Sequence, residues 1–264
     1  MTEVPHSDRQ EDTAGSSEAA KAELDVMNPR SAAELDVATP APPAGADRVF
    51  GDRLAMAEKF TAILADTGVS HGLIGPREIP RLWERHVLNC AVIHPAIPSD
   101  QMVIDVGSGA GLPGLALAIA RPDLDLHLIE PMLRRTNWLS MTVDELGLTN
   151  VTVHRGRAEE FAGVLRAPVV TARAVARLSE LARWCLPLLL PRGSLLAIKG
   201  LSVAEEVESD RAVLRRLGAI DEVIESFGIG ILDPETTVLR VVMGDRPVRR
   251  GGSKKSKPRA KRRG

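Results

Sequence analysis

The 264-residue sequence predicts an α/β protein with an open, mostly parallel sheet, helices on both of its faces, and a helical extension ahead of the first strand. Three observations lead to this prediction. Short apolar runs alternate with helical segments along most of the chain. A glycine cluster at 107–114 joins the first apolar run to a helix. The last two apolar runs have no helix between them, so we expect them to pair as an antiparallel hairpin.

Two helices are expected before the first strand. The first runs from Asp47, which is placed to cap it, to Gly68, which is placed to stop it. Its apolar stripe consists of Phe50, Leu54, Ala57, Phe60, Ile63 and Leu64. The second helix follows Pro80 and carries Arg81, Arg85 and His86 on its rim, with four apolar residues on its buried side: Leu82, Val87, Leu88 and Val92.

Strands and helices then alternate regularly. The expected strands are 102–106, 124–130, 150–154, 168–172 and 194–198, followed by the hairpin runs 220–226 and 237–243. The expected helices are 113–121, 132–146, 158–163, 178–189 and 203–216. Seven strands that end in an antiparallel hairpin are typical of class I methyltransferases, whereas dinucleotide-binding folds typically have six parallel strands. Three tryptophans at helical positions are expected in the core: Trp83, Trp138 and Trp184.

The turn after the first strand predicts a nucleotide-type cofactor site. Its glycines allow a ligand to approach the backbone, and the N–H groups of the following helix point at whatever is bound. The segment 109–114 is literally G-x-G-x-x-G, which alone also fits a dinucleotide. Asp105, two residues before the glycines, would repel a pyrophosphate but suits the ammonium of a methionine moiety. The pattern therefore favours S-adenosylmethionine.

The second strand ends in Glu130, an acid at the position where a carboxylate accepts hydrogen bonds from both ribose hydroxyls. NAD and S-adenosylmethionine share this need, so Glu130 supports a nucleoside without choosing between them. The alternative is a glycine-rich turn that binds nothing. Strand, turn, helix and acid in the required order favour the cofactor site.

Several classes of protein and site are not expected. No run of eighteen apolar residues indicates a membrane helix, and the polar segment 1–10 does not resemble a secretory signal, so we expect a cytoplasmic protein. Cys90 and Cys185 lie in apolar helical segments and are expected to be reduced core thiols. The six histidines show no spacing typical of metal ligands, so no metal is expected.

Charge divides the chain into three parts. Residues 1–47 hold ten acidic and three basic side chains and are expected to be a disordered acidic arm. Residues 246–264 hold ten Lys and Arg and no acid, and are expected to be a disordered basic tail. The domain between them, 48–245, has a helical extension (48–98) and a core (99–245), and is mildly acidic. We therefore expect the tail to supply attraction for RNA.

These motifs resemble one family, the small-subunit ribosomal RNA guanine-N7 methyltransferases (RsmG or GidB), over roughly residues 48–243. The most specific piece is the segment 105–114, which ends in Gly-Leu-Pro-Gly. The other matching segments are 81–89, Glu130 with Arg134 and Arg135, 157–160, 171–178 and 197–200. One departure is Glu130, because the family often has Asp there; the longer acid keeps a ribose contact possible.

The resemblance implies methyl transfer from S-adenosylmethionine to N7 of a guanine in the 530 loop of 16S rRNA. It implies that Gly107 and Leu112 line the methionine and ribose end, that Ala158 and Glu159 flank the adenine, and that Arg173 reaches the cofactor near the reacting centre. The full set of expected cofactor residues is Asp105, Gly107, Gly109, Gly111, Leu112, Glu130, Ala158, Glu159 and Arg173. Expected RNA contacts are Arg134, Arg135 and Lys199.

Other readings stay open at this point. The same fold could methylate a small molecule or a protein, or the chain could be a non-catalytic RNA-binding assembly factor. Arg173 could form only a surface ion pair, and Lys199 could be merely solvated. The expected partner is 16S rRNA or the small ribosomal subunit, and the expected oligomeric state is a monomer. Because the chain has no Tyr and only four Phe, RNA recognition must depend on arginines and on shape.

Overall fold

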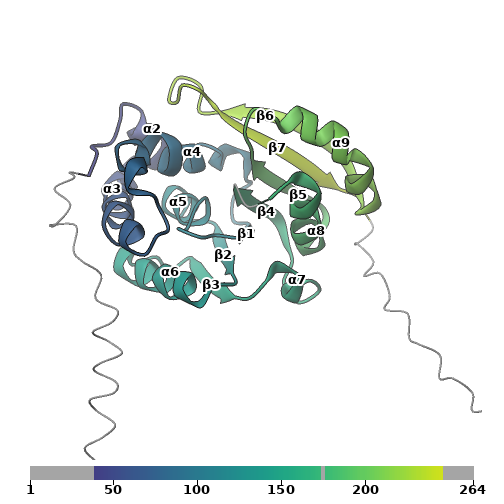
Figure 1. Cartoon of the computed structure of the whole chain (residues 1–264), viewed down its shortest axis with the longest axis horizontal. Helices are drawn as coiled ribbons and strands as arrows, with labels where there is room; N and C mark the ends of the chain where they lie inside the picture. Colours follow the sequence, from purple (N-terminus) through teal and green to yellow (C-terminus); the bar gives the residue numbers. More distant parts are fainter. Residues whose placement is uncertain (1–38, 174–175, 246–264) are drawn as a thin grey trace, which may run out of the picture.

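The computed structural model describes residues 39–173 and 176–245, which form a seven-stranded sheet of order β3-β2-β1-β4-β5-β7-β6 (Figure 1). The strands are β1 (Met102–Val106), β2 (Asp125–Glu130), β3 (Val151–Arg155), β4 (Ala167–Arg173), β5 (Leu189–Ile198), β6 (Ala219–Phe227) and β7 (Thr236–Met243). The pairs among β1 to β5 are parallel, and β7 is antiparallel to both of its neighbours. The predicted closing hairpin is confirmed.

Helices cover both faces of the sheet (Figure 1). The helices that follow the extension are α5 (Gly114–Ala120), α6 (Leu133–Leu146), α7 (Ala158–Phe161), α8 (Leu178–Cys185) and α9 (Val203–Arg216). The extension, α5 and α6 share one apolar cluster with Val103 of β1, whereas α7, α8 and α9 share the other with Ile104. Successive residues of a strand thus face opposite cores, as a sheet buried on both sides requires.

The first part of the extension differs from the single helix expected over 47–68. It consists of α2 (Ala46–Phe50), a 3₁₀ turn, α3 (Leu54–Ile63) and a π-helical turn (Leu64–Gly68). Gly51, at φ 50°, ends α2 and is the first residue of the 3₁₀ turn. Asp47 is not the cap, because Gly45 holds that position and no side chain caps the helix. Gly68 does not stop the helix, which continues to Ser70.

The second part of the extension is an irregular series of helical turns, which keeps the expected apolar residues buried and the expected basic residues on its rim. It consists of the 3₁₀ helix η4 (Pro76–Arg81), the π helix η5 (Leu82–Val87) and α4 (Leu88–Ala91). Leu82, Val87, Leu88 and Val92 are buried, as predicted. Arg81 and Arg85 are exposed and His86 is half-buried, so the predicted rim is confirmed.

Two boundaries in the core differ from expectation by more than two residues, whereas α9 has its predicted bounds. The helix expected over 178–189 ends at Cys185, and a 3₁₀ turn leads directly into β5. β5 begins at Leu189, five residues before the expected start, because the segment 190–193 bulges out of the strand. Leu189 pairs with Ala167, and pairing resumes at Ser194.

The folded body begins before residue 48. The Nε1 of Trp83 donates a hydrogen bond to the carbonyl of Pro40 at 2.9 Å, and Ala46 is 1% exposed. The rest of the predicted acidic arm (1–38), residues 174–175 and the predicted basic tail (246–264) lie outside the described residues. Cys90 and Cys185 are buried free thiols, as expected. Of the helices that the structure describes, none is both long and apolar enough to cross a membrane.

Candidate functional site

The glycine turn after β1 is held in a conformation that side chains would disturb. Gly107 has φ 72° and Gly111 has φ 77°, in the left-handed region that glycine adopts most easily. A Cβ on Gly111 would lie 2.4 Å from Leu115, and one on Gly114 would lie 2.2 Å from Leu128. The turn is therefore close-packed against its own helix and against β2, at the carboxyl end of β1.

Asp105 lies beneath this turn and is fully buried. One of its carboxylate oxygens accepts a hydrogen bond from the Thr171 hydroxyl at 3.1 Å, and the other accepts one from the Gly114 N–H at 3.2 Å. Burial raises the pKa of Asp105 to about 6, against the lowering effect of its hydrogen bonds. Asp105 thus joins β1, β4 and the turn. A direct contact with a bound ammonium remains a prediction.

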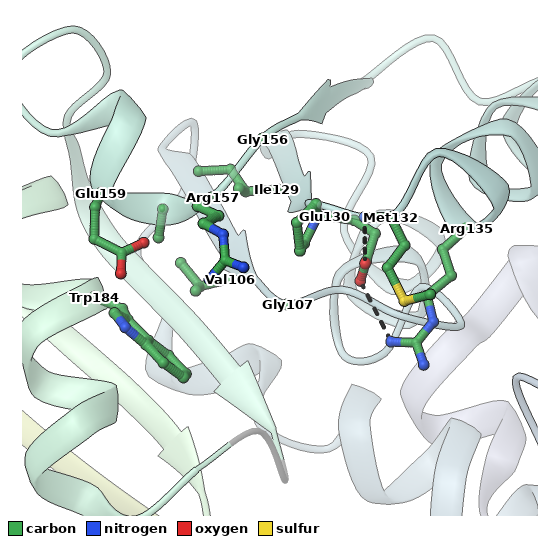
Figure 2. Close-up of a pocket in the computed structure, with 12 residues that line it drawn as sticks. Val106, Gly107, Ile129, Glu130, Met132, Arg135, Gly156, Arg157, Glu159 and Trp184 are labelled. Carbon is green, nitrogen blue, oxygen red and sulfur yellow. Dashed lines mark hydrogen bonds and ion pairs between the residues drawn. The ribbon is translucent and has the colours of Figure 1, made fainter.

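Glu130 lies at the tip of β2, 2% exposed, and its carboxylate accepts hydrogen bonds from two backbone N–H groups. Figure 2 shows the one from Met132, together with the ion pair to Arg135. Oε2 accepts the Gly109 N–H at 3.1 Å and Oε1 accepts the Met132 N–H at 3.0 Å. The guanidinium of Arg135 lies 3.8 Å from Oε2. Each carboxylate oxygen has two acceptor positions, so each can still accept a ligand hydroxyl.

A cavity of about 240 Å³ opens beside Glu130 (Figure 2). Five of the predicted site residues line it: Gly107, Glu130, Arg135, Ala158 and Glu159. The lining residues without a predicted contact are Val106, Ile129, Pro131, Met132, Gly156, Arg157 and Trp184. Apolar walls with a carboxylate at one end suit a nucleoside, whose base is flat and whose sugar presents hydroxyls.

Trp184 is half-buried: it packs against the second apolar cluster and also lines the cavity, so its expected place in the core is confirmed only in part. Trp83 and Trp138 are buried as expected. The buried stripe of α8 consists of Leu178, Leu181, Ala182 and Cys185. Those residues follow the i, i+3, i+4, i+7 spacing of one helix face, and position 184 falls outside it. The helical spacing therefore contains the signal that Trp184 lies off the buried stripe of α8.

Several predicted residues do not line this cavity. Gly109 contributes its N–H to Glu130, Gly111 and Leu112 are packed in the turn, and Arg134 is exposed at the start of α6. Lys199 follows β5, and its ammonium pairs with Glu206 at 2.7 Å and donates to the Ala176 carbonyl at 3.2 Å. Its side chain is 9% exposed, so a contact with RNA, which stays a prediction, requires this pair to open.

Arg173, the last residue of β4, lies against the helical extension. Its Nη1 donates to the Arg85 carbonyl at 3.1 Å, and its Nη2 lies 3.2 Å from Nδ1 of His86.

A second, larger cavity of about 880 Å³ lies between the extension, the end of β5 and the β6–β7 connection. It is lined by Arg81, Glu84, Arg85, Asn89, Lys199, Gly200, Leu201, Ser226, Leu232, Asp233, Pro234, Glu235 and Thr237.

Both cysteine thiols are fully buried. Burial raises the pKa of the Cys90 thiol to about 11 and raises that of Cys185 further, so neither is a ready nucleophile. Within residues 39–173 and 176–245 there is no group of three His, Cys, Asp or Glu side chains that could hold a metal ion.

The family model and the sequence relatives that match this chain carry the same name. The sequence model of the family described as GidB, rRNA small subunit methyltransferase G, matches residues 53–233. Ribosomal RNA small subunit methyltransferase G of Paenarthrobacter aurescens is 55% identical over 213 residues, which cover 81% of this chain and 95% of that protein. The protein of the same name from Streptomyces avermitilis is 52% identical over 231 residues, covering 87% and 94%. The one from Rhodococcus jostii is 55% identical over 201 residues, covering 75% and 88%.

Proposed function

The chain belongs to the rRNA small subunit methyltransferase G family, and we propose that it transfers the methyl group of S-adenosylmethionine to N7 of a guanine in the 530 loop of 16S rRNA. Its sheet has the class I methyltransferase strand order. The observation that supports this function best is the cavity that joins the glycine turn to Glu130.

The residues around that cavity fit S-adenosylmethionine. Glu130 keeps free acceptor positions for the ribose hydroxyls, and Val106, Ile129 and Ala158 offer apolar surface for the adenine. Gly107 exposes backbone where the methionine end would approach, because it has no Cβ. When bound, this cofactor supplies a methyl group on a positively charged sulfur.

The reaction needs little acid–base or nucleophilic chemistry from the side chains. Guanine N7 has an in-plane lone pair and carries no proton near neutral pH, so no general base is needed. The protein's contribution is then alignment of the base with the methyl group, a proximity effect.

RNA would approach the same side of the sheet, where arginines lie beside both cavities, on α6, on the β3–α7 connection and on the extension. Arg134 and Arg157 are exposed beside the cofactor cavity, and Arg81 and Arg85 are exposed on the larger cavity. Guanidinium groups suit phosphates because their planar fork can donate two hydrogen bonds to one anion. Arg134, Arg135 and Lys199 remain our predicted RNA contacts, with Lys199 requiring a change of partner.

The three-part organisation belongs to this proposal. The domain 48–245 carries four more acids than bases, so the ten positive charges of 246–264 would supply long-range attraction for RNA. If about five of them meet phosphates, the logarithm of RNA affinity should fall against the logarithm of salt with a slope near −3.5 on single strands. Deleting 246–264 should flatten that slope and leave cofactor affinity unchanged. An unaltered slope would assign the tail no role in binding.

The deciding experiment incubates the protein with S-adenosylmethionine carrying a labelled methyl group, and with either naked 16S rRNA or small subunits from cells that lack this gene. Mass mapping of the product should find one new 7-methylguanine in the 530 loop. Calorimetry without cofactor binding would instead indicate a non-catalytic assembly factor. Cofactor binding with label transferred only to small molecules or proteins would indicate a different methyltransferase.

A further inference from the structure

His86 lies between an acid and a base of two other elements. Its Nε2 is 3.0 Å from Oε2 of Glu78, a residue of η4. Its Nδ1 is 3.2 Å from Nη2 and 3.3 Å from Nη1 of Arg173, at the end of β4. The imidazole is 14% exposed, so water competes little for these contacts.

The chemistry of the neighbours fixes the protonation of His86. A guanidinium can only donate hydrogen bonds, so Nδ1 must present its lone pair to Arg173. A carboxylate accepts, so Nε2 must carry the proton and donate it to Glu78. One tautomer of the neutral ring satisfies both partners, and a doubly protonated ring would direct an N–H at the guanidinium.

Electrostatics favour the same state. Burial and the charge of Arg173 hold the pKa of His86 below its usual range, although Glu78 acts in the opposite direction. The hydrogen bond from His86 lowers the pKa of Glu78, which also pairs with Arg85 at 3.2 Å. The charged groups that face the imidazole are thus Glu78 of η4, Arg85 of η5 and Arg173 of β4; Arg81 acts on Glu78.

The contact orients Arg173. The imidazole nitrogen touches both terminal nitrogens of the planar guanidinium, and Nη1 also donates to the Arg85 carbonyl. Because the extension holds both terminal nitrogens and the guanidinium is planar, the orientation of the whole group, including its Nε, is fixed. The π helix η5 supplies both the Arg85 carbonyl and the His86 ring from consecutive residues, and such turns are frequent at functional sites.

We infer that Glu78 and His86 are positioning residues for methyl transfer, which hold the guanidinium of Arg173 in a fixed direction beside the reacting centre. This inference rests on the proposed function, in which Arg173 reaches the cofactor. It gives the extension a part in the reaction besides covering the sheet. Neither Glu78 nor His86 needs to touch substrate or cofactor.

Two variants that carry an amide side chain at position 86 test the inference. His86→Asn keeps an acceptor near the place of Nδ1, whereas His86→Gln places its amide near Nε2 and loses that acceptor. We expect His86→Gln and His86→Ala to lower kcat for methyl transfer by roughly ten- to a hundredfold, since a small misplacement of a positioned group costs that much. The Kd for S-adenosylmethionine should change by less than about threefold, and His86→Asn should recover most of kcat. His94→Asn, another half-buried histidine of the extension, is the matched control and should not differ from the parent protein.

Glu78 is tested in the same way, because Glu78→Gln keeps an acceptor for the Nε2 proton and Glu78→Ala does not. The acid side of the pH profile gives a readout that a merely structural residue would not move. The parent kcat should fall as the pH drops through the lowered pKa of His86, and His86→Asn should lack that component. Asp105, with a pKa of about 6, is present in both proteins, so the difference isolates His86.

The outcomes distinguish a failure of the proposed function from a failure of the positioning role. If the parent protein does not methylate 16S rRNA, the proposed function is wrong. If the parent is active and His86→Gln equals His86→Asn in kcat and in pH profile, the positioning role is wrong. His86→Gln and His86→Asn bury similar amides, so their comparison decides the matter even where His86→Ala does not fold.

Discussion

The two cavities lie along one side of the sheet, and the two halves of that side, the cofactor half and the half around Arg173, are built in different ways. At the ends of β1, β2 and β3, the site comes from partners close in sequence: Gly109 donates to Glu130, 21 residues away, and Gly114 donates to Asp105, nine residues away. At the ends of β4, β5 and β7, it comes from distant ones: Arg173 meets His86 across 87 residues, and Asn89 meets Thr236 across 147. The glycine turn and Glu130 of the cofactor half are thus joined locally, although Thr171 and Trp184 reach that half from later elements. The contacts of the other half form only once the whole fold has formed.

The largest effect is expected from a change in the local half. Gly107→Val should abolish detectable binding of S-adenosylmethionine, because a branched side chain opposes φ 72° and enters the methionine end of the cavity. Titration calorimetry on the folded variant measures this directly.

The matched control is Gly72→Val. Gly72 has φ 66°, with open space around its Cβ position, and lies in the extension away from the cavity. It should cost about the same in stability, roughly 1–2 kcal/mol for a left-handed residue, and leave cofactor binding intact. Parent-like affinity in a folded Gly107→Val protein would remove the glycine turn from the cofactor site.

An intermediate effect is expected where the halves meet, at Asp105. Its pKa of about 6 in the fold lies above the ordinary 3.8, so between these values the folded chain keeps a proton that the unfolded chain loses. The penalty for ionising the buried group therefore grows as the pH rises above 3.8 and is complete above 6, at roughly 3 kcal/mol.

Asp105→Asn cannot ionise, and its amide can accept from Gly114 and donate to Thr171. Its free energy of unfolding should exceed that of the parent by up to about 3 kcal/mol at pH 8, and the two should converge near pH 4. Denaturant titrations at both pH values measure this, and a constant difference would contradict the buried, half-protonated acid. A large loss of cofactor affinity would support the predicted contact with the ammonium instead.

The smallest effect is expected at Trp184, the wall residue farthest in sequence from the glycine turn. Trp83 and Trp138 are buried, so a change of tryptophan fluorescence on cofactor binding should come from Trp184. Trp184→Phe should lose that signal and weaken binding by about two- to tenfold, the size of an aromatic contact. Trp83→Phe should keep the signal; if it loses the signal instead, Trp184 does not contact the cofactor.

The sequence singled out Asp105, the glycines and Glu130 because a strand, a glycine turn, a helix and an acid follow one another over a short stretch of chain, and the structure joins them by hydrogen bonds. Their contacts with a cofactor stay a prediction. The helix over 203–216 was likewise predictable, because one apolar face repeats along it. The closing hairpin followed from two apolar runs without a helix between them.

The distant half could not be derived in this way. No spacing indicates that Arg173 would lie against His86 or that Lys199 would pair with Glu206, since both contacts depend on how the extension and α9 pack on the sheet. The start of β5 was missed because Pro191 and Gly193 read as a turn, whereas the strand runs on either side of a bulge. The irregular turns of η4 and η5 keep a helical apolar pattern while changing their hydrogen bonds, so periodicity cannot distinguish them.

The place of β7 has a consequence for biosynthesis. Among the described strands it is the last in sequence, yet it lies inside the sheet, between β5 and β6. As the ribosome makes a protein from its N-terminus, the inner edge of β5 stays unpaired until residues 236–243 emerge. Until then Leu239 and Val241 are missing from a core that α8 and α9 have already begun to form. A nascent chain of this enzyme therefore carries an open, aggregation-prone edge from the completion of β5 at Ile198 until β7 emerges, and closes it in one late step.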